Sequence, residues 1–276
     1  MRTAVIGHVE WVECAVVERV PQPGEIAHAR ETFEVPGGGG SIAAVQMALL
    51  TGDCTFYTAL GDDELGRRAI DELTAKGVRV EAAIRPGKST RRGFAFLDDG
   101  GERTITVMGE RLGPAAATDH ELPWAELAEV DAVYFVAGDA EALRAARAAK
   151  ALVATARISD LLREARVQLD AVVGSSVDVA ERYQPFEPAP RYVAITDGAR
   201  GGEWSGGEGR TGRWQAAELS GPVVDAYGAG DSFAAGLAVG LGRGDDVDAA
   251  LQLAARCGAT CMTGRGPYGR QLTCRA

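Results

Sequence analysis

The chain has 276 residues, of which 46% are hydrophobic and 25% are charged, and its formal net charge is −10. This length allows a sizeable buried core in one α/β domain or in two small ones. The acidic balance argues against nucleic acid or an anionic membrane surface as a partner, because either needs a basic patch that neutralises phosphates. An anionic ligand must therefore be held by local backbone amides and a few cations.

The cysteines favour a reducing compartment. There are five, at positions 14, 54, 257, 261 and 274, an odd number without the spacing of a disulfide framework. Cys257 and Cys261 are one helical turn apart, but no His or further Cys nearby completes a four-ligand metal set, so we expect buried free thiols. No secretory signal and no continuous apolar run long enough for a membrane span is recognisable, and we expect a cytoplasmic protein.

The N-terminal third alternates strand and helix patterns. The apolar run 3–6 predicts a buried strand, and residues 8–13 are predicted to form a loop at its carboxyl end, where open α/β sheets bind ligands. The glycines at 37–40 allow a ligand to approach the backbone closely before a predicted helix at 41–50. A second helix is predicted at 65–76, with Gly77 as its stop.

Partly alternating apolar and polar residues occur at 24–34 and again at 90–108. The second stretch predicts two strands around Asp98-Asp99-Gly100-Gly101, a strong hairpin signal. An edge hairpin without a role in binding is the alternative interpretation.

Farther along, strands are predicted at 132–137, 151–154, 171–173 and 192–196, with helices at 140–150 and 245–263. Strands that alternate with helices indicate a parallel sheet covered on both faces.

The most informative stretch is 222–240, PVVDAYGAGDSFAAGLAVG, which places an acid directly behind small residues at a predicted helix start. A ligand can approach the backbone N–H groups of Gly228, Ala229 and Gly230, so this turn is typical of an anion cradle. Asp231 has two interpretations. It is either a cap of the first helical turn, or a base that takes a proton from an attacking hydroxyl while the amides hold a transferring phosphoryl group.

This stretch resembles a signature of the ribokinase-like, or PfkB, carbohydrate kinase family. The family pattern D-T-x-G-A-G-D is present at 225–231 as DAYGAGD, with Ala226 in place of Thr. PGGGG at 36–40 resembles the first family signature, GDDELG at 61–66 the G-D-D-x-x-G turn, and TDGARG at 196–201 the T-x-G-x-x-G nucleotide segment. The four matches occur in the family's order along nearly the whole chain.

The resemblance implies a fold and a reaction. The fold is a three-layer α/β/α sandwich with a mostly parallel central sheet, as a single domain over residues 1–276. A small β lid, from segments near 24–34 and 90–108, pairs with a second subunit in some members. The reaction is ATP-dependent phosphorylation of an alcohol hydroxyl on a sugar or polyol, with Mg²⁺.

The resemblance also implies roles for individual residues. Asp231 is the expected catalytic base, and the amides of residues 228–230 are the expected anion hole. The expected nucleotide contacts are Thr196, Gly198 and Gly201, and the expected substrate contacts in the glycine segment are Gly38, Gly39 and Gly40. The loop at 264–269 is expected near the adenine pocket.

The chain departs from the family pattern at three polar positions. Val12 replaces an Asp, Ile42 an Asn, and Ser175 the Asn of an N-x-x-E motif. Glu10 stands at another Asn position and is the nearest replacement for that substrate contact, with a solvated surface carboxylate as the alternative. Asp178 stands at the Glu position that helps to organise magnesium, with a helix N-cap as the alternative.

These departures affect the expected ligand. An ionised Glu10 only accepts hydrogen bonds, so we expect the pocket to favour hydroxyl donors or a cationic group and to reject phosphorylated sugars. The departures also suggest an alternative, a non-catalytic sugar or nucleoside sensor that kept the fold, although the intact Asp231 argues against it. A nicotinamide-dependent oxidoreductase is disfavoured because the glycines at 38–40 follow a Pro instead of an apolar strand. The acceptor, and the choice between ATP and ADP, stay open.

Overall fold

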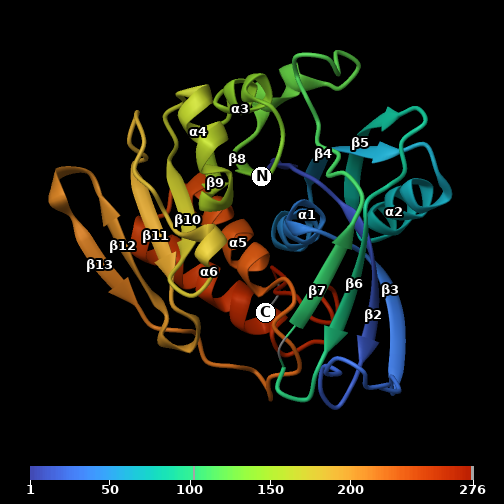
Figure 1. The fold of residues 1–276 in the computed structure, drawn as a ribbon. Coiled ribbons are helices and arrows are strands. Elements are labelled where there is room, and N and C mark those ends of the chain that lie inside the picture. The colour runs from blue at the N-terminus through green and yellow to red at the C-terminus, as the bar shows by residue number, and fades with distance from the viewer. Residues whose placement is uncertain (102, 275–276) are drawn as a thin grey trace.

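The structure, a computed structural model, describes residues 1–101 and 103–274 and contains two sheets (Figure 1). The large sheet contains, in spatial order, β13 (Thr211–Trp214), β12 (Gly202–Gly206), β11 (Tyr192–Thr196), β10 (Ala171–Ser175), β9 (Ala151–Thr155), β8 (Ala132–Phe135), β1 (Thr3–Ile6), β4 (Cys54–Gly61) and β5 (Val78–Arg85). All neighbours from β11 to β5 are parallel, and β12 and β13 are antiparallel additions at one edge. The carboxyl ends of the parallel strands therefore meet at one edge of the sheet.

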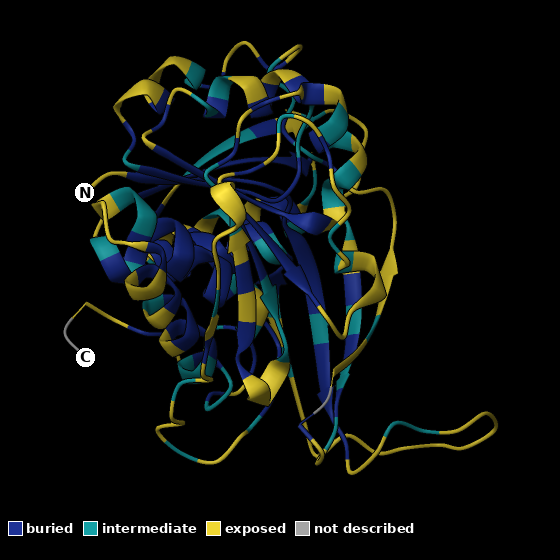
Figure 2. Ribbon diagram, turned by 90° about the vertical axis from the view of Figure 1, so that its left-hand side faces the viewer, coloured by how far each residue is buried: buried dark blue, intermediate teal, exposed yellow. Residues whose placement is uncertain are grey.

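Helices cover both faces of this sheet. On one face lie α1 (Gly39–Thr51), α2 (Glu64–Ala75), α5 (Ala229–Arg243) and α6 (Val247–Cys261); on the other lie α3 (Ala140–Ala146), α4 (Ser159–Ala165) and the 3-10 helix η1 (Trp124–Glu129). Strand β1 shows the division, because Val5 belongs to the first core and Ala4 and Ile6 to the second. Both faces of the strands are buried (Figure 2). The predicted three-layer sandwich is confirmed.

The small sheet contains β3 (Glu31–Gly37), β2 (Glu10–Val16), β6 (Arg92–Leu97) and β7 (Arg103–Met108), in that order. Its inner face, which includes Val12, Cys14 and Leu97, packs against Ile42 of α1 and Tyr227, just before α5. This packing attaches the small sheet to the larger part of the protein at the place where α1 and α5 begin. We call this sheet the lid.

Several predicted boundaries were wrong. Residues 8–13 are not all loop, because β2 begins at Glu10 and pairs with β3 and β6 as a central lid strand. In the segment 24–34 only the part from Glu31 onward is strand. The helix predicted at 140–150 ends at Ala146. Strands β4, β5, β12 and β13 and helix α4 were not predicted.

The remaining short elements are the 3-10 helices η2 (Ala156–Ile158), η3 (Val179–Glu181), η4 (Gly198–Arg200) and η5 (Gly207–Gly209). Cys257 and Cys261 are buried free thiols, as predicted. Within residues 1–101 and 103–274, no three His, Cys, Asp or Glu side chains are grouped so that they could bind a metal ion. In the same part of the chain, no helix combines the length and apolar character needed to span a membrane.

Candidate active site

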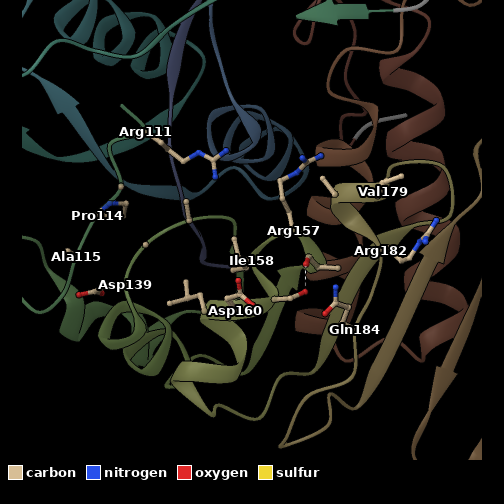
Figure 3. A pocket seen from close by; sticks show the side chains of 17 residues that line it. Arg111, Pro114, Ala115, Asp139, Arg157, Ile158, Asp160, Val179, Arg182 and Gln184 are labelled. Carbon is tan, nitrogen blue, oxygen red and sulfur yellow. Dashed lines mark hydrogen bonds between the residues drawn. The ribbon is translucent and has the colours of Figure 1, made fainter. Parts of the chain in front are cut away.

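Three cavities lie in a row along the edge where the parallel strands of the large sheet end. The central one has a volume of about 280 Å³ and is lined by Asp231, Glu10 and glycines of both helix starts. A mostly apolar cavity of about 530 Å³ shares Thr196 and Gly230 with it. On another side, a cavity of about 630 Å³ shares Arg111 and Arg157 with it (Figure 3). The three cavities therefore form a continuous site with a polar middle.

Asp231 is the acid at the centre of this site. It lies in the first turn of α5, but Gly228 is the N-cap and no side chain caps the helix. The capping interpretation of Asp231 is therefore wrong. Its carboxylate has no hydrogen-bond or ion-pair partner among the described residues, and burial together with the nearby Glu181 raises its pKa to about 7. This carboxylate is available to accept a proton from a ligand.

Two of the predicted substrate glycines lie against the catalytic end of the site. Gly38 has a φ of 91° and is the N-cap of α1, a backbone conformation that other residues rarely adopt. A Cβ atom on Gly39 would lie 2.5 Å from the Asp231 Oδ1. Both residues line the central cavity. Gly40 does not line the cavity, because it packs against the backbone of His8. A Cβ atom on Gly40 would lie 2.7 Å from the His8 oxygen.

The turn before α5 offers fewer free amides than expected. The Ala229 N–H donates to the Ala226 oxygen at 3.2 Å, so it closes the turn. In the described part of the chain, the N–H groups of Gly228, Gly230 and Asp231 have no such partner. The sequence analysis was wrong to include Ala229 and missed the amide of Asp231. The free groups still form an anion cradle at a helix N-terminus.

The predicted nucleotide residues line the apolar cavity. Thr196, Gly198 and Gly201 lie at its rim, and its walls are formed by Val177, Trp214, Leu219, Phe233, Ala255 and Met262. The loop at 264–269 does not itself line this cavity, although Met262, two residues before the loop, does. Instead, the Gly266 N–H donates to the buried Asp225 at 2.7 Å, and the Tyr268 hydroxyl donates to the Pro36 oxygen at 2.5 Å.

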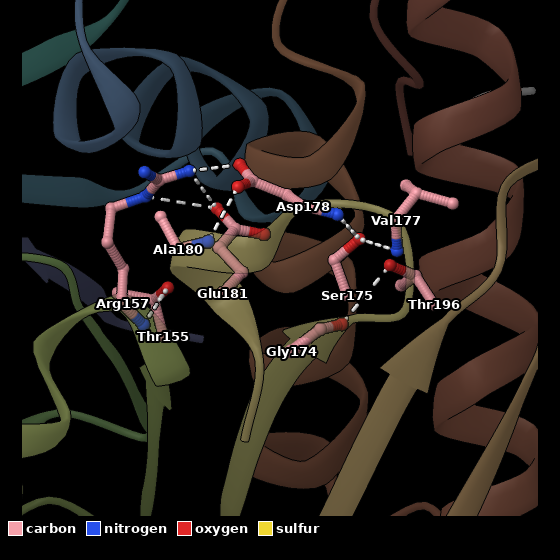
Figure 4. Close-up of polar contacts among 9 residues, drawn as sticks. All are labelled: Thr155, Arg157, Gly174, Ser175, Val177, Asp178, Ala180, Glu181 and Thr196. Atoms are coloured by element: carbon pink, nitrogen blue, oxygen red, sulfur yellow. Dashed lines mark hydrogen bonds and ion pairs between the residues drawn. The ribbon is translucent and has the colours of Figure 1, made fainter. Parts of the chain in front are cut away.

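A carboxylate pair, Asp178 and Glu181, lines the central cavity (Figure 4). Asp178 accepts from the Ala180 N–H at 2.9 Å and from the Arg157 Nη2 at 2.6 Å. Asp178 is therefore the N-cap of η3, as its alternative interpretation held, and also lines the central cavity. Glu181, three residues later, accepts from the same Arg157 Nη2 at 2.9 Å. The two carboxylates share one cation.

The part of the central cavity around Glu10 contains buried polar atoms that have no hydrogen-bond partner among the described residues. Glu10 is 6% exposed, so it is not a surface residue, and its Oε2 makes no hydrogen bond. Burial raises the pKa of the Glu10 carboxyl, although Arg91, Arg111 and Arg103 oppose this shift. The His8 Nδ1 and the Tyr227 hydroxyl are also unpaired, and burial lowers the pKa of His8 to about 3. Such atoms are costly to bury without a partner and indicate a polar ligand.

The basic residues and one of the acids that line the central cavity were not predicted from the sequence: His8, Arg103, Arg111, Arg157 and Glu181. His8 follows Gly7 at the end of β1, so its position beyond a strand end was a usable signal. Glu181 follows Asp178 by three residues, so a second acid close to a candidate site acid was also a usable signal. The arginines come from η2, β7 and the loop after it, and nothing in their spacing predicts that they converge.

Comparisons with known proteins find relatives among the carbohydrate kinases. The chain matches the model of the pfkB family carbohydrate kinases over residues 2–170 and 139–273. It is 28% identical to an ATP-dependent ribose-1-phosphate kinase from Halopiger xanaduensis, over 94% of this chain and 91% of that protein. It is 27% identical to a fructokinase from Vibrio alginolyticus, over 91% of this chain and 92% of that protein. An Arabidopsis thaliana ribokinase structure with ribose and ATP matches with a TM-score of 0.77 at 19% identity, over 98% and 95% of the two chains.

We expect the Asp231→Asn substitution to stabilise the protein in a pH-dependent way. The Asp231 pKa is raised, to about 7, so the folded state loses stability as the pH rises from about 4 to 7 and the carboxylate ionises. Asn cannot ionise, so the variant does not lose this stability. The difference in the free energy of unfolding is at most about 4 kcal/mol, as estimated from the size of the pKa shift. The Tm of the variant should exceed that of the unmodified protein at pH 8, and the difference should shrink towards pH 4. A difference that does not change with pH would contradict the raised pKa.

We expect Gly230→Ala to impair ligand binding without loss of stability. A Cβ on Gly230 meets no atom within 4 Å, and Ala favours the first turn of a helix over Gly. The added methyl group enters the space beside the free amides, so kcat/KM should fall about tenfold or more. Kinetics and Tm are measured together with the control Gly207→Ala, whose Cβ also meets no atom but lies outside the site. Equal kinetics for both variants would exclude the anion cradle.

Proposed function

The chain belongs to the pfkB family of carbohydrate kinases, and we propose that Asp231 is the base with which it activates the acceptor hydroxyl. The protein is a sugar kinase that transfers a phosphoryl group from ATP to an alcohol hydroxyl. One observation carries the assignment of Asp231: an unpaired carboxylate with free amides beside it lies where the polar and apolar cavities meet.

The reaction follows from this placement. The acceptor hydroxyl donates its proton to Asp231 while its oxygen forms a bond to the γ-phosphorus, and the bond from that phosphorus to the ADP oxygen breaks. The amides of Gly228, Gly230 and Asp231 stabilise the charge on the transferring group. A base whose pKa is about 7 is well matched to proton transfer near neutral pH.

The donor occupies the apolar cavity in this proposal. Its rim of Thr196, Gly198 and Gly201 offers little side-chain bulk to the ribose and phosphates, and its apolar walls suit a planar base. The phosphates then extend past Gly230, which both cavities share, towards Asp231.

We also propose a Mg²⁺ ion at Asp178 and Glu181. Mg²⁺ is usually held by one or two protein carboxylates together with substrate phosphates, and these two carboxylates lie 2.6 and 2.9 Å from the shared Arg157 Nη2 beside the proposed phosphate path. The donor set therefore fits the ion. When bound, the ion neutralises phosphate charge; the carboxylates hold it, and Arg157 keeps them in place.

The acceptor lies in the central cavity between Glu10, Gly38 and Gly39. The relatives whose names specify a substrate act on ribose 1-phosphate and fructose, and we propose a sugar or polyol acceptor here as well. No observation on this chain favours the sensor alternative.

We propose further that residues 1–276 act as one kinase domain in the cytoplasm, where its five free cysteines stay reduced.

The lid is the proposed surface for a homodimer. Its outer face carries the half-buried Phe94 and Phe96, with ring centroids 5.0 Å apart, and its edge strand β7 exposes Val107 and Met108. An unpaired edge with apolar side chains favours association. Light scattering should therefore give twice the chain mass, and Phe96→Glu should give the single mass. A monomeric unmodified protein would contradict the dimer.

The function is tested with Asp231→Asn. We expect kcat for the best acceptor to fall by about 10²- to 10⁴-fold, the usual effect of losing a general base, while nucleotide binding is retained. The assay follows ADP release with Mg²⁺-ATP and a panel of sugars and polyols, and calorimetry follows the binding of a nonhydrolysable ATP analogue. Asp71→Asn, on the exposed side of α2, is the control. An active Asp231→Asn variant would exclude the base.

A further inference from the structure

The acceptor side of the central cavity is more positive than the protein as a whole. Arg103 and Arg111 line the cavity, and Arg91 lies behind Glu10. Against these three cations stands the single carboxylate of Glu10, in a chain whose net charge is −10. His8 adds no charge, because its lowered pKa keeps it neutral.

The positive charges are largely unpaired. Arg111 has no hydrogen bond or ion pair within the described residues, and burial and the nearby Arg91 lower the pKa of its guanidinium. Among the described residues, the Arg103 guanidinium contacts the face of the Tyr227 ring, 4.9 Å from the ring centroid. The buried Arg91 Nε forms an ion pair with the Glu10 Oε2 at 3.5 Å but makes no hydrogen bond among the described residues.

The fourth arginine of the cavity differs. Arg157 is bonded to both Asp178 and Glu181, so its charge is compensated. Figure 3 shows Arg111 and Arg157 extending from different walls towards the same space. The uncompensated positive charge of the cavity therefore belongs to Arg111 and to Arg103 of the lid, and not to Arg157 at the proposed magnesium position.

We propose that the acceptor carries an anionic group, a phosphate or a carboxylate, which binds between Arg111 and Arg103 while a hydroxyl of the same molecule lies at Asp231. The inference rests on the proposed function, because it places the acceptor in the central cavity. An anion satisfies the unpaired guanidinium donors with charge-assisted hydrogen bonds. Acceptor hydroxyls can in turn bond to the unpaired Glu10 Oε2, His8 Nδ1 and Tyr227 oxygen.

This conclusion reverses the expectation that Glu10 would make the pocket reject phosphorylated sugars. Glu10 could be recognised from the sequence, but the arginines around it could not. Arg91 directly precedes β6, Arg103 begins β7, and Arg111 lies in the loop after β7, so all three are far from Glu10 in the chain. Glu10 is opposed by three arginines, so it no longer sets the sign of the pocket's potential. The phosphorylated product then carries two anionic groups.

The test compares neutral and anionic forms of the same acceptors: ribose with ribose 1-phosphate and ribose 5-phosphate, fructose with fructose 6-phosphate, and glucose with gluconate. Each is assayed with Mg²⁺-ATP for kcat and both KM values, and each is tested for a Tm shift without nucleotide. The variants are Arg111→Gln, Arg111→Lys and, as the control, Arg92→Gln. Arg92 is the neighbour of Arg91 but pairs with Glu13, which does not line the cavity.

We expect an anionic acceptor to exceed its neutral form in kcat/KM by tenfold or more. Arg111→Gln should raise its KM about 10- to 100-fold, as expected for a lost charge-assisted hydrogen bond, and leave the KM for ATP and for neutral sugars unchanged. Arg111→Lys should restore part of the affinity, and Arg92→Gln should behave like the unmodified protein. Comparing the kcat/KM of the phosphorylated sugars with that of gluconate shows whether the site prefers a phosphate or a carboxylate.

Three results would overturn the proposal. The first is a higher kcat/KM for neutral sugars than for their anionic forms, with turnover that depends on Asp231. The proposed function would then hold, and the proposed anionic group on the acceptor would be wrong. The second is a raised KM for ATP in Arg111→Gln with no change for the acceptor, which would assign the arginine to the nucleotide phosphates. The third is neither turnover nor a Tm shift with any anionic acceptor. A Tm shift by an anionic sugar that Arg111→Gln abolishes, without turnover, would support the anion site and contradict the proposed function.

Discussion

The close approach of α1 and α5 is the constraint on which the site depends. A Cβ on Gly39 would lie 2.5 Å from the Asp231 Oδ1, and a Cβ on Gly7, at the end of β1, would lie 3.0 Å from the Gly40 Cα. Two helix N-termini thereby converge at one carboxylate, with only glycine hydrogens between them. Both helices direct the positive ends of their dipoles at the ligand. A larger residue at Gly39 would separate the base from the substrate glycines.

Electrostatics divides the site into regions with different tasks. Asp231 is destabilised as an anion, because burial and Glu181 raise its pKa to about 7 in spite of the arginines nearby. Arg157 balances the Asp178–Glu181 pair. Arg103 and Arg111 remain unbalanced beside the neutral His8. A protein that is acidic overall thus concentrates uncompensated positive charge at one small cavity, where it attracts an anionic ligand.

The lid and the loop after α6 complete the site from outside the large sheet. Asp225 accepts hydrogen bonds from the Tyr227 and Gly266 N–H groups, at 2.9 and 2.7 Å, so the turn before α5 is tied to the C-terminal loop. Tyr227 also packs against the inner face of the lid. Lid position and the Asp231 turn are therefore coupled through Tyr227. The unpaired atoms of His8, Glu10 and Tyr227 reduce the stability of the empty protein and are the groups that a ligand satisfies.

The sequence alone predicted the layers of the fold and singled out Asp231 as the candidate base, and the tertiary structure decided the charge and shape of the cavity beside it. Strand β11 and the acid of α5 were predictable because alternation, glycine spacing and helix-start chemistry are local. Strand β2 was missed because its pairing with β3 and β6 depends on residues far away in the chain. The Ala229 N–H was predicted to bind an anion, but in the structure it donates a hydrogen bond to the Ala226 oxygen within the turn. Arg91, Arg103 and Arg111 converge on Glu10 only through folding, since charges from separate segments leave no periodic pattern in the sequence.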